Sequence, residues 1–122
     1  MAGTIVADTL QDGAGNSTAM DNAIYGSAKA WATFNATAVV NASYNVSSIT
    51  KNSAGNFTLN FTTAITDVNY AVIGSALGGL FSLSPVTNTT TTCNFVMYFH
   101  SFTTNGVPTA TDSTYNSIVI HR

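Results

Sequence analysis

Histidine, cysteine and acidic side chains, the usual carriers of catalysis and metal binding, are few and scattered in this chain. There are two histidines, His100 and His121, and one cysteine, Cys93. A zinc site needs three or four Cys, His or carboxylate ligands, and neither histidine has a second one at a spacing that shares a helix or strand face. Cys93 and His100 are seven residues apart in one expected strand, so they point to opposite faces. We therefore expect no metal site and no cofactor.

The acidic residues do not indicate a hydrolase either. A glycoside hydrolase needs two carboxylates that flank the bond to be cleaved, and the chain has five Asp and no Glu. Asp67 opens an expected strand and Asp112 ends an expected loop, which are positions where Asp commonly caps or turns the backbone. Residues 8–16 approach a calcium-binding loop, but the spacing differs and the closing Glu is missing. We predict that the protein is not an enzyme.

One pattern favours binding rather than catalysis: aromatic residues beside uncharged polar loops. Tyr98, Phe102 and Tyr115 adjoin segments rich in Asn and Thr, and Asn105 lies in the loop expected at 101–114. Binding residues are commonly found on loops that a rigid scaffold positions. These four residues are the predicted receptor-binding residues, and their neutral chemistry suits an uncharged glycan. The alternative is that the loop merely connects two strands.

Charge is unusually sparse in this chain. Asp, Glu, Lys and Arg make up 7% of the residues, against about 25% in typical soluble domains. The three basic residues, Lys29, Lys51 and Arg122, are too few to follow a phosphate backbone, so nucleic-acid binding is not expected. A polar but nearly uncharged surface gives little long-range repulsion between copies. This favours close packing of identical chains.

No membrane segment and no export signal are expected. The sequence lacks an apolar run long enough for a transmembrane helix. Residues 1–6 have neither the basic region nor the long apolar core of a secretory signal. The single cysteine, Cys93, excludes an intramolecular disulfide and fits a reducing site of synthesis. We expect assembly in the cytoplasm without membrane insertion, and Cys93 buried and unpaired in an apolar strand.

Apolar residues alternate with polar ones in a pattern that predicts an all-β fold. The clearest strand is 56–62, where Phe57, Leu59 and Phe61 share one face, and with 48–52 it predicts a hairpin around a short Gly-containing turn. Further strands are expected at 31–34, 43–50, 67–74, 80–83 (ended by Pro85), 93–100 and 115–121. Turn signals that recur about every ten residues indicate an antiparallel β-sandwich, jelly-roll-like, at 29–122. Residues 1–28, with a short strand at 5–10 and a loop at 11–18, are expected to form an extended N-terminal arm for attachment or oligomerisation.

Several segments occur in a recognisable order: IVADTLQD at 5–12, GSAKAWATFN at 26–35, SYNVSSIT at 43–50, FTLNFTTA at 57–64 and DVNYAV at 67–72, with a closing strand at 116–122. This order resembles the C-terminal domain of phage tail-fibre and related virion proteins, especially those of marine phages. Residues 26–76 carry the specific part of the resemblance, and residues 77–114 would be the variable part.

The resemblance implies a virion protein that is a trimeric β-sandwich at the end of a fibre, with a host receptor as its ligand. This chain differs because it starts just upstream of the domain, without a long fibre shaft. It is therefore also expected to suit a capsid decoration or head-fibre protein that binds other virion proteins through residues 1–28. The sequence leaves both versions open.

Overall fold

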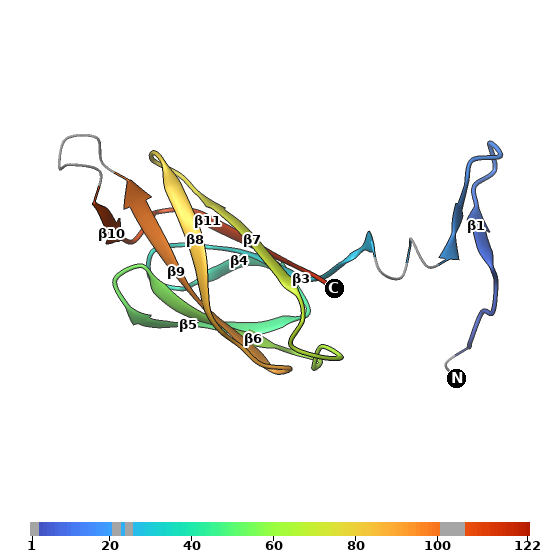
Figure 1. Ribbon diagram of the computed structural model, residues 1–122, viewed down its shortest axis with the longest axis horizontal. Helices are drawn as coiled ribbons and strands as arrows, with labels where there is room; N and C mark the ends of the chain where they lie inside the picture. Colours follow the sequence, from blue (N-terminus) through green and yellow to red (C-terminus); the bar gives the residue numbers. More distant parts are fainter. Residues whose placement is uncertain (1–2, 21–22, 24–25, 101–106) are drawn as a thin grey trace.

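The computed structural model describes residues 3–20, 23, 26–100 and 107–122, which form an antiparallel β-sandwich and a separate N-terminal hairpin (Figure 1). The strands are β1 (Thr9–Gln11), β2 (Ser17–Ala19), β3 (Ala28–Phe34), β4 (Val40–Tyr44), β5 (Val46–Ser53), β6 (Asn56–Phe61), β7 (Ala71–Ala76), β8 (Phe81–Asn88), β9 (Thr92–His100), β10 (Pro108–Ala110) and β11 (Asn116–His121). The predicted all-β antiparallel fold is confirmed. In this part of the chain no helix has the length and apolar character needed to cross a membrane.

The sandwich consists of two sheets. The first, which we call the β11 sheet, has the strand order β4-β3-β11-β7. The second, the β9 sheet, has β6 and then β5 on one side of β9 and β8 on the other, and the short β10 pairs with the end of β9 beyond β6. Between β4 and β5 the chain passes from one sheet to the other at Asn45, whose φ is 53°. The strand pairings are all antiparallel, so turns gather at the two ends of the sandwich.

The core lies between the sheets and is built by alternation along the strands. In β6 and β11 every second residue is buried, as predicted: Phe57, Leu59 and Phe61 in the first and Ile118 and Ile120 in the second. Facing aromatic rings join the two layers. Phe34 of the β11 sheet meets Phe57 of the β9 sheet edge to face, with ring centroids 5.1 Å apart, a geometry that adds about 1 kcal/mol beyond area burial.

Near Pro85 the structure corrects the expected strand end. Strand β8 does not stop at Pro85 but continues to Asn88, with an irregular register between Pro85 and Thr87. Proline is tolerated there because β8 pairs only with β9 and is an edge strand. No described strand pairs with the outer edge of β8, so the missing N–H of Pro85 breaks no inter-strand hydrogen bond on that edge.

Three other boundaries also differ from the expected ones. The segment 43–50 is not one strand, since Asn45 divides it between the two sheets. Strand β7 begins at Ala71 rather than at Asp67, because the Asp67 carboxylate accepts the N–H of Asn69 at 2.7 Å and holds a turn. The predicted loop at 101–114 contains a strand, β10.

Residues 9–19 form a hairpin, so the short strand expected at 5–10 begins only at Thr9 and a second strand occupies the end of the loop expected at 11–18. Strands β1 and β2 pair from Thr9↔Ala19 to Gln11↔Ser17. The Asp12 carboxylate closes the turn by accepting the N–H groups of Ala14 and Asn16 and the side-chain amide of Asn16. These bonds, the one from the Asn16 side chain first, hold the pKa of Asp12 below its usual value. Asp12 thus stabilises a turn, which is the alternative to a role as a calcium ligand.

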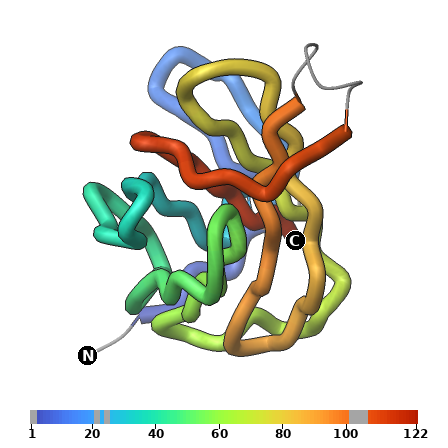
Figure 2. Tube along the Cα trace, turned by 90° about the vertical axis from the view of Figure 1, so that its left-hand side faces the viewer, coloured from blue at the N-terminus to red at the C-terminus, as the bar shows by residue number. Residues whose placement is uncertain are grey.

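The sandwich has two distinct ends. The N-terminal hairpin and the C-terminus lie toward one end in Figure 1, which we call the arm end. The turns β3–β4, β5–β6 and β7–β8 and the segment that joins β10 to β11 lie at the opposite, distal end, which faces the viewer in Figure 2. This arrangement decides which residues can form a common surface.

Candidate functional site

The distal end is the candidate functional site, because both described residues predicted to bind a receptor, Tyr98 and Tyr115, belong to its strands and loops. Its framework is the segment 111–116, which connects the two sheets and bonds to three neighbouring turns. Thr111 donates its N–H to the carbonyl of Met97 at 3.2 Å, on β9. Leu77, after β7, donates its N–H to the carbonyl of Tyr115 at 2.9 Å. The distal loops therefore form one connected framework.

Asp112 is the polar centre of this framework. Its Oδ1 accepts the N–H of Gly55 at 2.9 Å and its Oδ2 accepts a bond from the Lys51 ammonium at 2.5 Å. Lys51 also donates to the carbonyl of Ala36 at 3.0 Å, so one ion pair joins the β3–β4, β5–β6 and β10–β11 connections. Burial alone would raise the pKa of Asp112, but the bonds from Gly55 and Lys51 outweigh burial and hold that pKa below its usual value. The carboxylate is structural and is engaged by cationic and N–H donors.

Gly55 permits the close approach at this point. Its φ is 67°, in the left-handed region, and a Cβ at this position would lie 2.5 Å from the backbone nitrogen of Thr111 and 2.7 Å from the carbonyl oxygen of Met97. Met97 also donates its N–H to the carbonyl of Gly55 at 2.8 Å. The turn thus packs directly against the backbone of β9 and of the next loop, which only glycine allows.

Ser113 and Asn116 fix the start of β11. The Ser113 hydroxyl contacts the carbonyls of Leu77 and Tyr115 at 2.6 and 3.0 Å. The side-chain amide of Asn116, fully buried, donates to the carbonyls of Ser113 and Phe34. These bonds place Tyr115 at the surface of the distal end, where its side chain is exposed.

The structure describes two of the four predicted receptor-binding residues. Tyr98 is half-buried in β9, opposite Ser82 of β8 and Ala110 of β10, whereas Tyr115 is in the loop that leads into the β11 sheet. Both therefore belong to the distal end but arise from different sheets. Phe102 and Asn105 lie outside the described residues.

Sequence reasoning missed a group of exposed apolar residues at the same end. They are Val39, Leu77, Leu80 and Val107. Leu77 adjoins Tyr115 through the backbone bond given above, and the carbonyl of Leu80 accepts the N–H of His100 at 2.8 Å. The Gly78–Gly79 pair signalled a turn, but nothing in the sequence showed that the leucines on either side of it would face solvent or that Leu77 would adjoin Tyr115.

In the part of the chain that the structure describes, no group of three or more His, Cys, Asp or Glu side chains could hold a metal ion. Asp67 is at the arm end, paired with Arg122 through two bonds of 3.0 Å to Nε and a closer contact to Nη2, which with the Asn69 N–H keep the pKa of Asp67 low. His100 shares a 2.7 Å hydrogen bond with Ser82, and Cys93, seven residues earlier, is fully buried.

A cleft of about 550 Å³ opens at the arm end. It is lined by Ser27, Ala28, Lys29, Tyr44, Asn45, residues 62–66 and Arg122. The side chain of Asn45 shapes its floor by donating to the carbonyls of Lys29 and Thr63 and accepting the N–H of Thr63 at 2.8 Å. The cleft combines an exposed aromatic ring with two cationic side chains.

The fold and the sites together define an all-β antiparallel sandwich. Hydrogen bonds join its loops at the distal end, and the arm lies at the other end. The chain matches no family model, no curated protein and no solved structure.

Proposed function

We propose that the protein is a non-enzymatic phage virion subunit, a module like a tail-fibre tip that binds a host-surface glycan at its distal end. The observation that carries the proposal is the separation of two surfaces. The arm leaves one end of the sandwich, and the distal loops occupy the other (Figure 2), with the exposed Tyr115 in the segment between β10 and β11. An attachment segment and a recognition surface on opposite ends are what a fibre tip requires.

The chemistry of the distal end favours a neutral glycan. Its described charged residues, Lys51 and Asp112, bond to each other, so the surface offers hydroxyls, amides, aliphatic groups and the ring of Tyr115. Aromatic and aliphatic faces with a few placed polar groups are the usual lining of a small-molecule site. An anionic polymer would find no cluster of cations among these residues.

The self-assembly expected from the sequence belongs to the same proposal. We propose a homotrimer in the virion, assembled in the host cytoplasm and joined to other virion proteins through residues 1–28. The sparse charge and the apolar arm support association. Light scattering on the purified chain should give about three times the 12.7 kDa of one chain, and a stable monomer at micromolar concentration would contradict this part of the proposal.

Competition with phage adsorption tests the glycan-binding role. Replacing 101–107 by a Gly-Ser linker keeps β10 and Asp112 in place, and Leu77→Ser and Tyr115→Ala alter described residues of the same end. We expect all three variants to compete at least tenfold less well than wild type for host cells. Val68→Ser, an exposed apolar residue near the arm end, is the matched control and should compete normally. If Leu77→Ser and Tyr115→Ala compete like the wild type, the distal end is not the receptor site.

The second candidate is a capsid decoration or head-fibre protein without a ligand. The exposed apolar residues of the arm, Ile5 and Val6, favour it because they suit attachment to a particle surface. Locating the chain in intact particles by electron microscopy distinguishes the two: density at a tail tip supports the fibre module, and density on the capsid supports decoration. A wild-type protein that never competes with phage also decides for decoration.

A further inference from the structure

The outer faces of the two sheets have opposite character. On the β9 sheet, amide and hydroxyl side chains bond across the strands: Asn94 and Asn52 reach Thr58, and Asn60 reaches Ser48 and Thr50. Polar groups that are already paired and face outward make a surface suited to water. On the outer face of the β11 sheet, Ser75 and Ser117 share a cross-strand bond of 2.8 Å, and the row beside them is apolar.

An apolar row crosses the outer face of the β11 sheet. Tyr44 lies opposite Trp31, Trp31 opposite Val119, and Val119 opposite Ile73. Residues directly opposite in antiparallel strands point to the same side, so these four side chains form one continuous row over β4, β3, β11 and β7. Tyr44 and Ile73 are each 59% exposed and Trp31 is 36% exposed. The row next to it consists of Ala42, Thr33, Ser117 and Ser75 and is uncharged.

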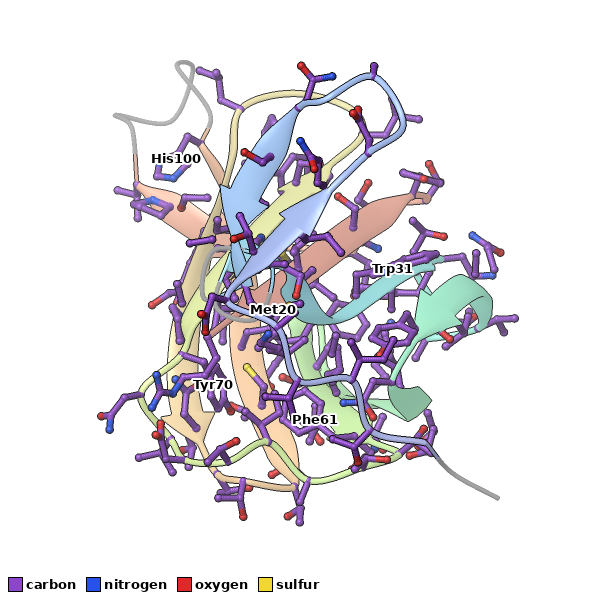
Figure 3. All side chains as sticks on the ribbon, turned by 90° about the vertical axis from the view of Figure 1, so that its right-hand side faces the viewer. Met20, Trp31, Phe61, Tyr70 and His100 are labelled. Carbon is purple, nitrogen blue, oxygen red and sulfur yellow. The ribbon has the colours of Figure 1, made fainter. Side chains whose placement is uncertain are left out.

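The arm has exposed apolar residues of its own. Ile5 is 86% and Val6 93% exposed, and Leu10 on β1 is also exposed. The hairpin stands apart from the sandwich in Figure 1, and Figure 3, seen from the arm end, shows it as a separate element, with Trp31 on β3 at one side of the sandwich. An isolated two-stranded hairpin is marginally stable in water. The arm therefore needs a surface to cover it.

Charge indicates which surface that is. Residues 1–28 contain three Asp (Asp8, Asp12 and Asp21) and no Lys or Arg, whereas residues 29–122 contain all three basic residues and two Asp. Lys29 and Arg122 line the arm-end cleft, and Tyr44 belongs both to that cleft and to the apolar row. An acidic, apolar arm thus matches a cleft that carries Lys29 and the Arg122–Asp67 ion pair and that continues into an apolar face of a second copy.

Area argues against simple face-to-face pairing of two sheets. Four strands spaced about 4.8 Å apart and six residues of about 3.3 Å each give a face of roughly 400 Å², below the roughly 800 Å² per partner of a stable interface. An arm laid across the face adds its own contact area. A contact between two different surfaces is heterologous and closes into a ring when the rotation permits.

We propose that the arm of a second copy, residues 3–20, lies across the apolar row and brings Asp8 to the cleft beside Lys29, so that copies join arm to face in a closed ring. Asp8 is the carboxylate for this contact because the Asp12 carboxylate is occupied within its own turn. The inference rests on the proposed self-assembly and names the two surfaces that produce it.

Disulfide trapping tests the contact directly. Val6→Cys in a tagged chain and Ile73→Cys in an untagged chain are co-expressed and oxidised mildly, and Cys93 does not compete because it is buried. We expect a tagged–untagged cross-link at least tenfold more abundant than with Val86→Cys on β8 of the other sheet, since Val86 is 58% exposed and thus matched to Ile73. Equal cross-linking to both positions, or none to Ile73→Cys, overturns the proposal.

A chain that carries both Val6→Cys and Ile73→Cys tests whether the arm instead contacts the apolar row of its own sandwich. An internal disulfide in a 12.7 kDa species would show that the arm folds back on its own sandwich, which refutes the exchange. In light scattering, Ile73→Asp should give monomers at a concentration where Val86→Asp stays assembled.

An Ile73→Asp protein that assembles normally refutes the arm-to-face contact and leaves the virion role intact. Absence of the chain from particles refutes the virion role but not the contact.

Discussion

Gly55→Ala is the substitution for which the structure gives the sharpest expectation. The left-handed φ costs an alanine about 1 kcal/mol, and the new Cβ would meet backbone atoms of Thr111 and Met97 at under 3 Å. Backbone atoms cannot move aside as easily as the end of a flexible side chain can, so the β5–β6 turn must move outward. That movement breaks the bonds of Gly55 N–H to Asp112 and of Met97 N–H to Gly55, each worth about 1 kcal/mol. The sum predicts a loss of roughly 3 kcal/mol in the free energy of unfolding.

Gly78→Ala is the matched control. Gly78 also has a positive φ, 109°, but no atom lies within 4 Å of the position of its Cβ. This variant should lose only the strain of the backbone conformation, roughly 1–2 kcal/mol. The comparison separates conformational strain from close packing at the distal end.

Urea unfolding followed by the fluorescence of Trp31, the single tryptophan, measures both variants at one protein concentration, because association shifts apparent stability. We expect Gly55→Ala to melt roughly 10 °C below the wild type in a thermal scan. If Gly55→Ala costs no more than Gly78→Ala, the close contact between the β5–β6 turn and β9 does not exist in solution, and the connected distal framework is refuted.

Four further outcomes follow from the same structure. Asp112 has a lowered pKa, so its contribution to the free energy of unfolding is complete above its pKa in the unfolded chain, about 4, and is lost as the pH falls through the lower pKa of the folded protein. Asp112→Asn should be less stable than the wild type at pH 7, by about 1 kcal/mol, and its stability should depend less on pH in the acid range. An unchanged dependence of stability on acid pH would contradict this. Burial raises the pKa of Cys93 to about 11, so a thiol reagent at pH 8 should label native protein only as fast as it unfolds; rapid labelling would show an exposed thiol. Acrylamide should quench Trp31 more strongly in Ile73→Asp than in the assembled wild type, and equal quenching would mean that assembly does not cover the apolar row. A chelator should leave the melting temperature unchanged, whereas a drop would reveal a bound metal.

The sequence predicted well wherever one strand faces the core on one side only. Period-two alternation marked β6 and β11 and identified their buried residues, because burial of one face forces that pattern. It also identified the partly double-sided β9, where Phe95, Val96 and Met97 are buried in succession. The burial of Cys93 is confirmed for the same reason.

The predictions from the sequence were wrong where the effect of a residue depends on which strands lie beside it. Pro85 was expected to end a strand, yet an edge position makes the lost N–H harmless. Asn45 lies within an apparently continuous strand, and only the stacking of two sheets makes its positive φ a crossing point. The loop at 101–114 hid β10, whose three residues are too short to carry a periodicity of their own.

By itself, the sequence determined the all-β class and the sparse charge, because composition and alternation are local properties. Only the tertiary structure decided which loops share the distal end, that Asp112 joins three of them, and that Tyr44, Trp31, Val119 and Ile73 align in one row. Those relations depend on the register between strands far apart in the chain. Register is set by the packing of the whole core, and no window of the sequence contains it.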